Sequence, residues 1–201
     1  MSGDHQPTAP MARRVAALER LLTEHGALHD EQVDDVEDMF CHRMGAQNGA
    51  RYVARAWTDP QFRDQLLADA TVVLKEHGYD LTGATNRELP FLRLIVVENT
   101  ERVHNLVVCT LCSCYPVSLL GPSPRWYKSF AYRSRAVREP RTVLAEFGVR
   151  LDPEVEVRVW DSTADCRYLV LPRRPAGTEE LTEEELAGLV TRDGLIGTGP
   201  V

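Results

Sequence analysis

The chain has 201 residues, of which 43% are apolar, enough for the hydrophobic core of one compact domain with an appendage. Its 30 acidic residues outnumber its 23 basic residues, and this net charge of −7 argues against nucleic acid as a partner. Because the sequence has neither an apolar stretch near the roughly 20 residues of a membrane span nor a basic start followed by an apolar run, we expect a cytoplasmic protein without membrane attachment.

The first 80 residues are predicted to be mostly helical. Residues 1–10 contain two prolines and are expected to be disordered. Apolar residues then recur at helical spacing, and Asp59 followed by Pro60 is typical of a capped helix start. The predicted helices cover residues 11–25, 30–45, 46–57 and 59–78. We therefore expect a helical arm over residues 11–80.

Beyond residue 80 the pattern becomes that of short strands. Runs rich in β-branched residues predict strands at 94–97, 103–108, 155–160 and 167–171. A helix is predicted at 141–147, and Thr182 with Glu185 matches the capping box of a last helix. Prolines and glycines between residues 116 and 124 predict an irregular segment. We expect an α+β fold in which the helical arm precedes a layered α-β-β-α domain (residues 81–201).

Three cysteines lie within six positions, Cys109-Thr110-Leu111-Cys112-Ser113-Cys114, here called the cysteine loop (residues 109–114). An odd total of five cysteines, three of them clustered, does not resemble a disulfide framework. Thiolate sulfur selects transition metals over magnesium and calcium. The single residue between Cys112 and Cys114 also brings backbone amides close to any metal that these sulfurs hold. The cysteine loop is therefore a candidate metal site.

The spacing leaves four interpretations open. A tetrahedral zinc site needs a fourth ligand, for which Cys41, Cys166 or His104 is available. An iron–sulfur cluster also takes four cysteines, and the chain has no second C-x-x-C pair. Three reduced core thiols without chemical function are the third possibility. In the fourth, backbone nitrogens of Ser113 and Cys114 join the three sulfurs and leave one coordination position for a substrate.

The segment 108–116 resembles the metal motif of the nitrile hydratase alpha subunit. The resemblance covers about residues 13–197 and includes segments on both sides of the cysteine loop. The similar segments are 48–51, 54–57, 67–70, 97–100, 103–105, 126–135, 137–141, 158–163, 173–179 and 190–193.

The resemblance implies a metal centre with a defined ligand set. Low-spin cobalt(III) or iron(III) would be held by the sulfurs of Cys109, Cys112 and Cys114 and by the amide nitrogens of Ser113 and Cys114. Cys112 would be oxidised to the sulfinic acid and Cys114 to the sulfenic acid. Thr110, the residue after the first cysteine, favours cobalt(III) over iron(III).

The same resemblance implies the hydration of a nitrile to an amide, with Cys112, Ser113 and Cys114 as catalytic residues. The nucleophile is either the sulfenate oxygen of Cys114 or a water activated by the metal. The partner is a nitrile hydratase beta subunit, or two smaller beta-like subunits, whose arginines bind the oxidised sulfurs. A metal-loading activator protein is also expected. The chain would be active only with its partner, which the helical arm is expected to embrace.

Two departures from the family pattern bear on the substrate. Val117 stands where most members have tryptophan, and the smaller side chain predicts room for a bulky or heterocyclic nitrile. Residues 87–92 lack the family's glutamine linked to catalysis. The alternatives are a gamma-type subunit of thiocyanate hydrolase, or a non-catalytic metal-binding protein of the same fold.

Five further residues have two interpretations each. Trp126 and Tyr127 either border the substrate cavity or belong to the core. Asp161 and Arg167 form either a pair that steadies the cysteine loop or a plain structural salt bridge. Arg133 either steers anions or lies at a subunit contact.

Overall fold

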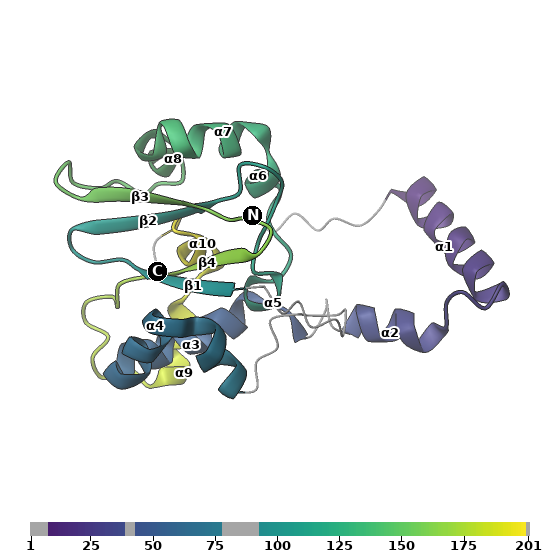
Figure 1. Cartoon of the computed structure of the whole chain (residues 1–201), viewed down its shortest axis with the longest axis horizontal. Helices are drawn as coiled ribbons and strands as arrows, with labels where there is room; N and C mark the ends of the chain where they lie inside the picture. The colour runs from purple at the N-terminus through teal and green to yellow at the C-terminus, as the bar shows by residue number, and fades with distance from the viewer. Residues whose placement is uncertain (1–7, 39–42, 78–92, 200–201) are drawn as a thin grey trace.

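The computed structural model describes residues 8–38, 43–77 and 93–199. Its four strands form two parallel pairs (Figure 1). Strand β1 (Arg93–Glu98) pairs with β4 (Cys166–Leu171), and strand β2 (Val103–Val108) pairs with β3 (Glu156–Asp161). The strands are confirmed close to their predicted positions. The consecutive strands β2 and β3 are therefore hydrogen-bonded to each other, whereas β1 pairs with the last strand, β4.

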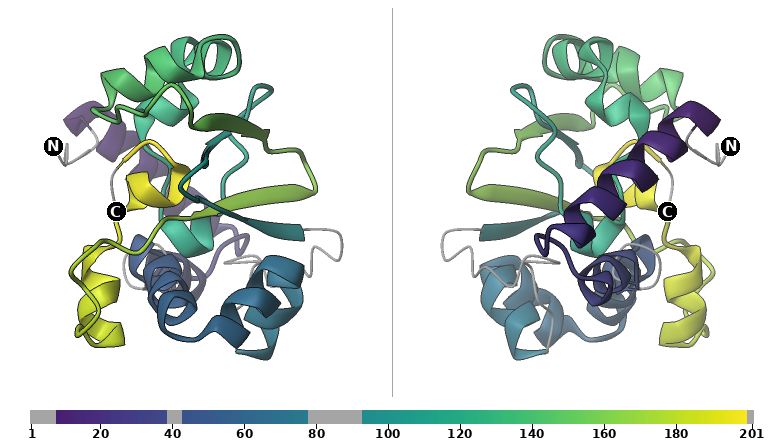
Figure 2. Two further views of the ribbon diagram at one scale, coloured as in Figure 1. Left: turned by 90° about the vertical axis from the view of Figure 1, so that its left-hand side faces the viewer. Right: turned by 90° about the vertical axis from the view of Figure 1, so that its right-hand side faces the viewer.

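Helices cover both sides of this strand layer (Figures 1 and 2). On the side of β2 and β3 lie α7 (Phe130–Arg138) and α8 (Pro140–Glu146). On the side of β1 and β4 the helices are α3 (Ala46–Thr58), α4 (Pro60–Glu76) and α9 (Glu183–Leu189). This arrangement confirms the predicted α+β fold with α-β-β-α layers.

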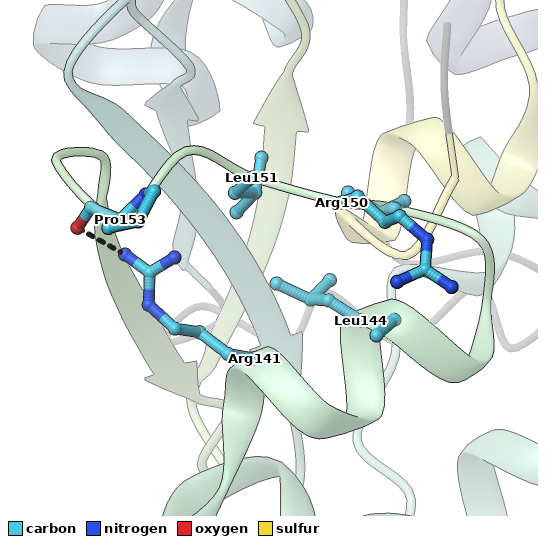
Figure 3. Close-up of a pocket in the computed structure, with 7 residues that line it drawn as sticks. Arg141, Leu144, Arg150, Leu151 and Pro153 are labelled. Atoms are coloured by element: carbon cyan, nitrogen blue, oxygen red, sulfur yellow. Dashed lines mark hydrogen bonds between the residues drawn. The ribbon is translucent and has the colours of Figure 1, made fainter.

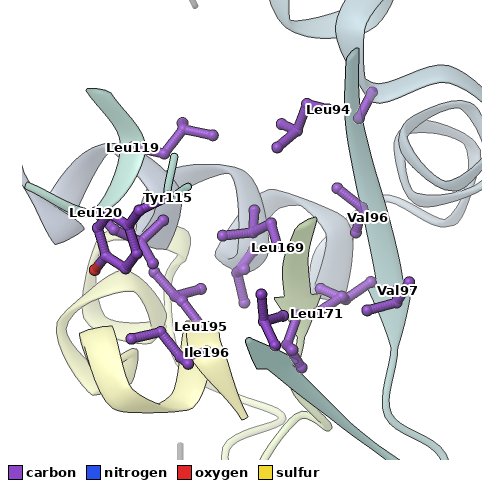
Figure 4. Packing of buried hydrophobic residues seen from close by; sticks show 14 of the residues in the cluster. Leu94, Val96, Val97, Tyr115, Leu119, Leu120, Leu169, Leu171, Leu195 and Ile196 are labelled. Atoms are coloured by element: carbon purple, nitrogen blue, oxygen red, sulfur yellow. The ribbon is translucent and has the colours of Figure 1, made fainter. Parts of the chain in front are cut away.

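A continuous apolar core joins the strands to the helices that surround them (Figure 4). Leu169 and Leu171 of β4 are buried beside two short helices, α5 (Val117–Leu120) and α10 (Arg192–Ile196). Each fully buried leucine contributes about 1.5–3 kcal/mol of hydrophobic free energy. Because α5 begins three residues after the cysteine loop, this packing also fixes where that loop can lie.

The helices predicted in the first 80 residues are present, but they play different parts. Helices α3 and α4 pack into the core, and Asp59 caps α4 by accepting a hydrogen bond from the Phe62 amide at 3.0 Å, as predicted. In contrast, α1 (Ala9–Glu24) and α2 (Asp30–Asp38) extend away from the layered body (Figure 1). The predicted domain boundary at residue 80 lies outside the described residues and stays a prediction.

The sequence did not predict four short helices. They are α5, α6 (Arg125–Lys128), α7 and α10. Helix α7 has only two buried residues, Tyr132 and Ala136, so its apolar pattern is too sparse to be recognised. The second predicted helix is described over Asp30–Asp38, and residues 39–42, which belong to its predicted remainder, lie outside the described ranges. Across those ranges, no helix combines the length and the apolar character that a membrane span requires.

Candidate metal centre

The cysteine loop begins where β2 ends, beside the end of its partner strand β3. Val108 lies opposite Asp161 in the register of these parallel strands. The Asp161 carboxylate therefore reaches the loop and accepts two hydrogen bonds from Thr110, from the amide at 2.9 Å and from the hydroxyl at 2.5 Å. These bonds fix the chain immediately after Cys109.

The three sulfurs of the cysteine loop form a compact triangle. Cys112 Sγ lies 3.5 Å from Cys109 Sγ and 3.3 Å from Cys114 Sγ. The three sulfurs all lie within 4.8 Å of one another, with Cys109 buried and Cys112 exposed. Two sulfurs about 2.3 Å from one metal are about 3.3 Å apart at a right angle and about 3.8 Å apart at a tetrahedral angle. The distance between the Cys112 and Cys114 sulfurs matches the right angle, and the distance between the Cys109 and Cys112 sulfurs lies between the two values. The triangle therefore fits a soft metal ion that binds these sulfurs as neighbouring ligands.

No fourth side-chain ligand joins the triangle among the His, Cys, Asp and Glu residues of the described ranges. His104 is buried and its Nε2 lies 2.7 Å from the Gly197 carbonyl oxygen, while burial lowers the pKa of its imidazole. Cys166 lies at the start of β4 with its thiol near the Arg167 carbonyl oxygen. Cys41 falls outside the described residues. The geometry therefore gives no support to a tetrahedral zinc site completed by His104 or Cys166.

The buried side of the cysteine loop rests on aromatic residues. Tyr127, which is fully buried on α6, donates a hydrogen bond from its hydroxyl to the Cys114 carbonyl oxygen at 2.9 Å. Its ring also contacts Tyr115 edge-on, with ring centroids 5.1 Å apart. Trp126 packs against Tyr132 and Phe147 at centroid distances of 4.9 and 4.7 Å. Tyr127 thus belongs to the core and supports the loop, and Trp126 is half-buried and packs against the core.

Arg133 of α7 contacts the cysteine loop directly. Its Nη1 donates to the carbonyl oxygens of Cys112 at 3.1 Å and Thr110 at 3.4 Å. The sequence pattern alone did not reveal this contact. Arg167 donates instead to main-chain carbonyls of its own turn, including Thr163 at 2.5 Å. The Asp161 carboxylate accepts its hydrogen bonds from Thr110 and not from Arg167. Asp161 therefore steadies the cysteine loop through Thr110.

The thiols differ in how readily they ionise when no metal is bound. Hydrogen bonds with the thiols of Cys114 and Cys109, and with the amides of Ser113 and Cys114, lower the pKa of Cys112 to about 7. Burial, followed by the hydrogen bond with Cys112, raises the pKa of Cys114 to about 12. Thiolate is the form of cysteine that binds metal.

Large apolar side chains are exposed in the cysteine loop and at the start of α7, the helix that carries Arg133. Leu111 within the loop is 85% exposed and Phe130 at the start of α7 is 78% exposed. Val117, the residue at the departure from the family pattern, is half-buried at the start of α5. Residues 87–92, where the expected glutamine is missing, lie outside the described residues. Large exposed apolar side chains next to a candidate site are typical of a surface that a partner covers.

A separate cavity of about 400 Å³ lies between α8 and the segment that leads to β3 (Figure 3). Leu144 and Leu151 form its apolar wall, and Arg141 donates hydrogen bonds to the carbonyl oxygens of Asp152 and Pro153, each at 3.2 Å. Its lining residues include neither the cysteine loop nor the side chains that contact it. This cavity is therefore not part of the candidate metal centre.

Comparison with known proteins places the chain in one family. The family model described as "Nitrile hydratase, alpha chain" matches residues 9–199. The low-molecular weight cobalt-containing nitrile hydratase subunit alpha of Rhodococcus rhodochrous is 54% identical over 187 residues, which cover 93% of this chain and 87% of that protein.

Two solved structures share the fold closely. A double mutant of the Fe-type nitrile hydratase from Comamonas testosteroni Ni1 superimposes with a TM-score of 0.86 at 43% identity, covering 97% of this chain and 92% of the other. A recombinant thiocyanate hydrolase comprising partially modified cobalt centres gives a TM-score of 0.84 at 40% identity, covering 96% of this chain and 90% of the other. With the sulfur triangle at the end of β2 and a family match along nearly the whole chain, this protein belongs to the nitrile hydratase alpha-chain family.

Proposed function

We propose that this chain is the metal-holding alpha subunit of a cobalt nitrile hydratase, an enzyme that hydrates a nitrile to the amide. The observation that carries the proposal is the sulfur triangle of Cys109, Cys112 and Cys114, with spacings of 3.5 and 3.3 Å between neighbouring sulfurs. Membership in the family and the cobalt-containing relative at 54% identity support both the reaction and the metal.

The proposed centre holds one cobalt(III) ion through the three sulfurs and the main-chain nitrogens of Ser113 and Cys114. Cys112 is proposed to carry the sulfinic acid and Cys114 the sulfenic acid. The ion supplies Lewis acidity that draws electron density from the nitrile carbon. One structurally similar protein is an Fe-type nitrile hydratase, so the fold alone does not select the metal. The preference for cobalt(III) over iron(III) therefore rests on Thr110 and on the cobalt-containing relative.

The chain's own side chains hold the centre in place and leave one side open. Asp161 fixes the loop from β3, Tyr127 supports it from the core and Arg133 binds it from α7. Cys112 is exposed, as is the side chain of its neighbour in the loop, Leu111. A beta subunit, or two smaller beta-like subunits, is proposed to cover this side and complete the catalytic site. A metal-loading activator protein is proposed to deliver the ion.

The substrate is proposed to be a bulky or heterocyclic nitrile. Val117 is half-buried near the cysteine loop, and it is much smaller than the tryptophan typical of the family. Replacing Val117 with tryptophan should therefore reduce activity on aromatic nitriles while leaving activity on a small nitrile largely unchanged. The proposal would be contradicted if the Val117→Trp variant kept the wild-type ratio of activity on aromatic nitriles to activity on the small nitrile.

The function is tested by co-expression with the neighbouring reading frames in medium containing cobalt. We expect about one cobalt ion per chain, added oxygen on Cys112 and Cys114 by mass spectrometry, and conversion of nitriles to amides. Cys109→Ala should abolish metal binding, while Cys166→Ala, which changes a thiol outside the triangle, should retain it. Zinc on unmodified thiols would indicate a non-catalytic metal protein. Hydrolysis of thiocyanate without nitrile hydration would instead favour a gamma-type thiocyanate hydrolase subunit.

A further inference from the structure

Arg133 is held firmly beside the cysteine loop. Ser129 caps the helix that carries it, accepting a hydrogen bond from the Tyr132 amide at 3.1 Å. The adjacent residue, Tyr132, is buried and donates its hydroxyl to the Val107 carbonyl oxygen at 2.6 Å, which ties α7 to β2. The position of the Arg133 guanidinium is therefore set by the same strand that ends in the cysteine loop.

The charge of Arg133 has no acidic partner within the described part of the chain. Its Nη1 contacts two main-chain carbonyl oxygens, and its Nε is buried without a hydrogen-bond partner. Arg135, two positions further on α7, instead binds the carboxylates of Glu139 at 2.7 Å and Glu146 at 2.6 Å. A half-buried cation that lacks a counter-ion is costly, and nearby negative charge offsets that cost.

The carbonyl oxygen of Cys112 is where such negative charge would develop. This oxygen belongs to the same peptide group as the Ser113 nitrogen, which is one of the proposed metal ligands. Resonance within a peptide group couples its nitrogen to its oxygen. A peptide nitrogen that binds a trivalent ion without its proton therefore shares its negative charge with the carbonyl oxygen. For the Ser113 nitrogen, that oxygen lies 3.1 Å from Arg133 Nη1.

We propose that Arg133 is a positioning residue whose guanidinium balances the charge on the Cys112–Ser113 peptide group and so stabilises the ion held by the loop. Hydrogen bonds between an ionised donor and an ionised acceptor are about twice as strong as neutral ones. The second bond, to the Thr110 carbonyl oxygen, keeps the loop oriented toward α7. This inference rests on the proposed function, because it requires a main-chain nitrogen among the ligands.

The test compares Arg133→Met and Arg133→Lys with the wild type in the co-expressed, cobalt-loaded complex. Arg138→Met is the matched control, because Arg138 lies on the same helix and its Nε bonds to the Ser134 carbonyl oxygen, outside the cysteine loop. Cobalt loss to a chelator is followed by metal analysis, and the sulfur-to-metal absorption band is recorded. Arg133→Met should lose cobalt about tenfold faster or more and shift the band. Arg133→Lys should be intermediate because it keeps the charge, and the control should match the wild type.

Melting temperatures with and without metal separate this role from ordinary structural support. Loss of structural support lowers both melting temperatures equally, whereas loss of the balancing charge lowers that of the loaded complex more. The inference is overturned, and the proposed function is left intact, if Arg133→Met lowers both melting temperatures equally and leaves the absorption band and the rate of cobalt loss unchanged. If Arg133→Met does not assemble, Arg133→Lys decides by the same criteria. A wild-type complex that holds zinc on thiolates alone overturns both proposals.

Discussion

At the scale of residues, the cysteine loop is shaped by side chains distant in the sequence. Asp161 lies 51 positions after Thr110 and accepts two of its hydrogen bonds. Tyr127 bonds to the main chain of Cys114, and Arg133 bonds to the main chain of Cys112. None of these hydrogen bonds is made by a sulfur, so the three thiols remain available for a metal.

Replacing Thr110 tests the importance of this support. Thr110→Val keeps the shape of the side chain but removes the hydroxyl that donates to Asp161. A lost hydrogen bond to a charged group at this exposed position should lower the free energy of unfolding by about 1–2 kcal/mol. We also expect less cobalt per chain, because the residue after Cys109 becomes less restrained. Urea unfolding and metal analysis measure the two effects.

Thr110→Ser is the matched control for stability, because serine keeps the hydroxyl that donates to Asp161 and should retain the free energy of unfolding of the wild type. If Thr110→Val and Thr110→Ser behave alike, the hydroxyl–carboxylate bond does not support the site.

At the scale of elements, Asn105 links the two strand pairs. Its side-chain amide donates to the Glu98 carbonyl oxygen at the end of β1 at 2.7 Å and accepts from Trp160 of β3 at 2.8 Å. Its backbone approaches Gly197, which follows α10 with a φ of 89°. A Cβ at Gly197 would overlap the Asn105 carbonyl oxygen. The close approach of α10 to β2 therefore depends on glycine at position 197.

Alanine substitutions at two glycines separate backbone conformation from this close approach. Gly148 has a φ of 85° and nothing within 4 Å of an added Cβ, whereas Gly197 has both a positive φ and a steric overlap. Gly148→Ala should therefore cost only the conformational penalty of about 1–2 kcal/mol. Gly197→Ala should cost clearly more, because β2 or α10 must move. If urea unfolding shows the same loss of free energy of unfolding in both variants, the contact between Gly197 and Asn105 accommodates the added methyl group without a further cost.

At the scale of the whole molecule, the N-terminal helices stand apart from the body (Figure 1). One face of α1 carries four apolar side chains whose exposed fractions lie between 49% and 56%, and no residue of this helix is buried. The residues of this apolar face are Met11, Val15, Leu18 and Leu21. An amphipathic helix whose apolar face is exposed in the described structure is suited to bind a partner chain.

Deleting residues 1–38 tests whether this arm serves assembly. The truncated chain should still fold, because the buried core begins with α3. The deletion stops before residue 45, because Gly45 packs against Gly121. We expect the truncated chain to lose its partner subunit, which size-exclusion chromatography with light scattering would detect.

Point variants on α1 provide the control. Leu18→Ser and Leu21→Ser on the apolar face should weaken assembly, while Arg13→Ser and Arg20→Ser on the polar face should not. An intact complex after the deletion would show that the arm is not needed for assembly.

Several features could be predicted from the sequence because their signals are local. The cap of α4 by Asp59 and the capping box of Thr182 with Glu185 each involve residues a single turn apart, and both are present. Short β-branched runs likewise located the four strands of the described residues. The chemical character of the candidate site was also local, because three thiols within residues 109–114 favour a transition metal over magnesium or calcium.

The tertiary structure decided how these pieces meet. It alone paired β1 with β4 and β2 with β3, and this pairing places Asp161 beside the cysteine loop. It alone brought the guanidinium of Arg133 to the Cys112 carbonyl oxygen. Such contacts depend on the path of the whole chain and on the packing of the core, which no local pattern encodes. The sequence by itself thus determined which atoms can hold a metal, and the fold determined which side chains hold those atoms in place.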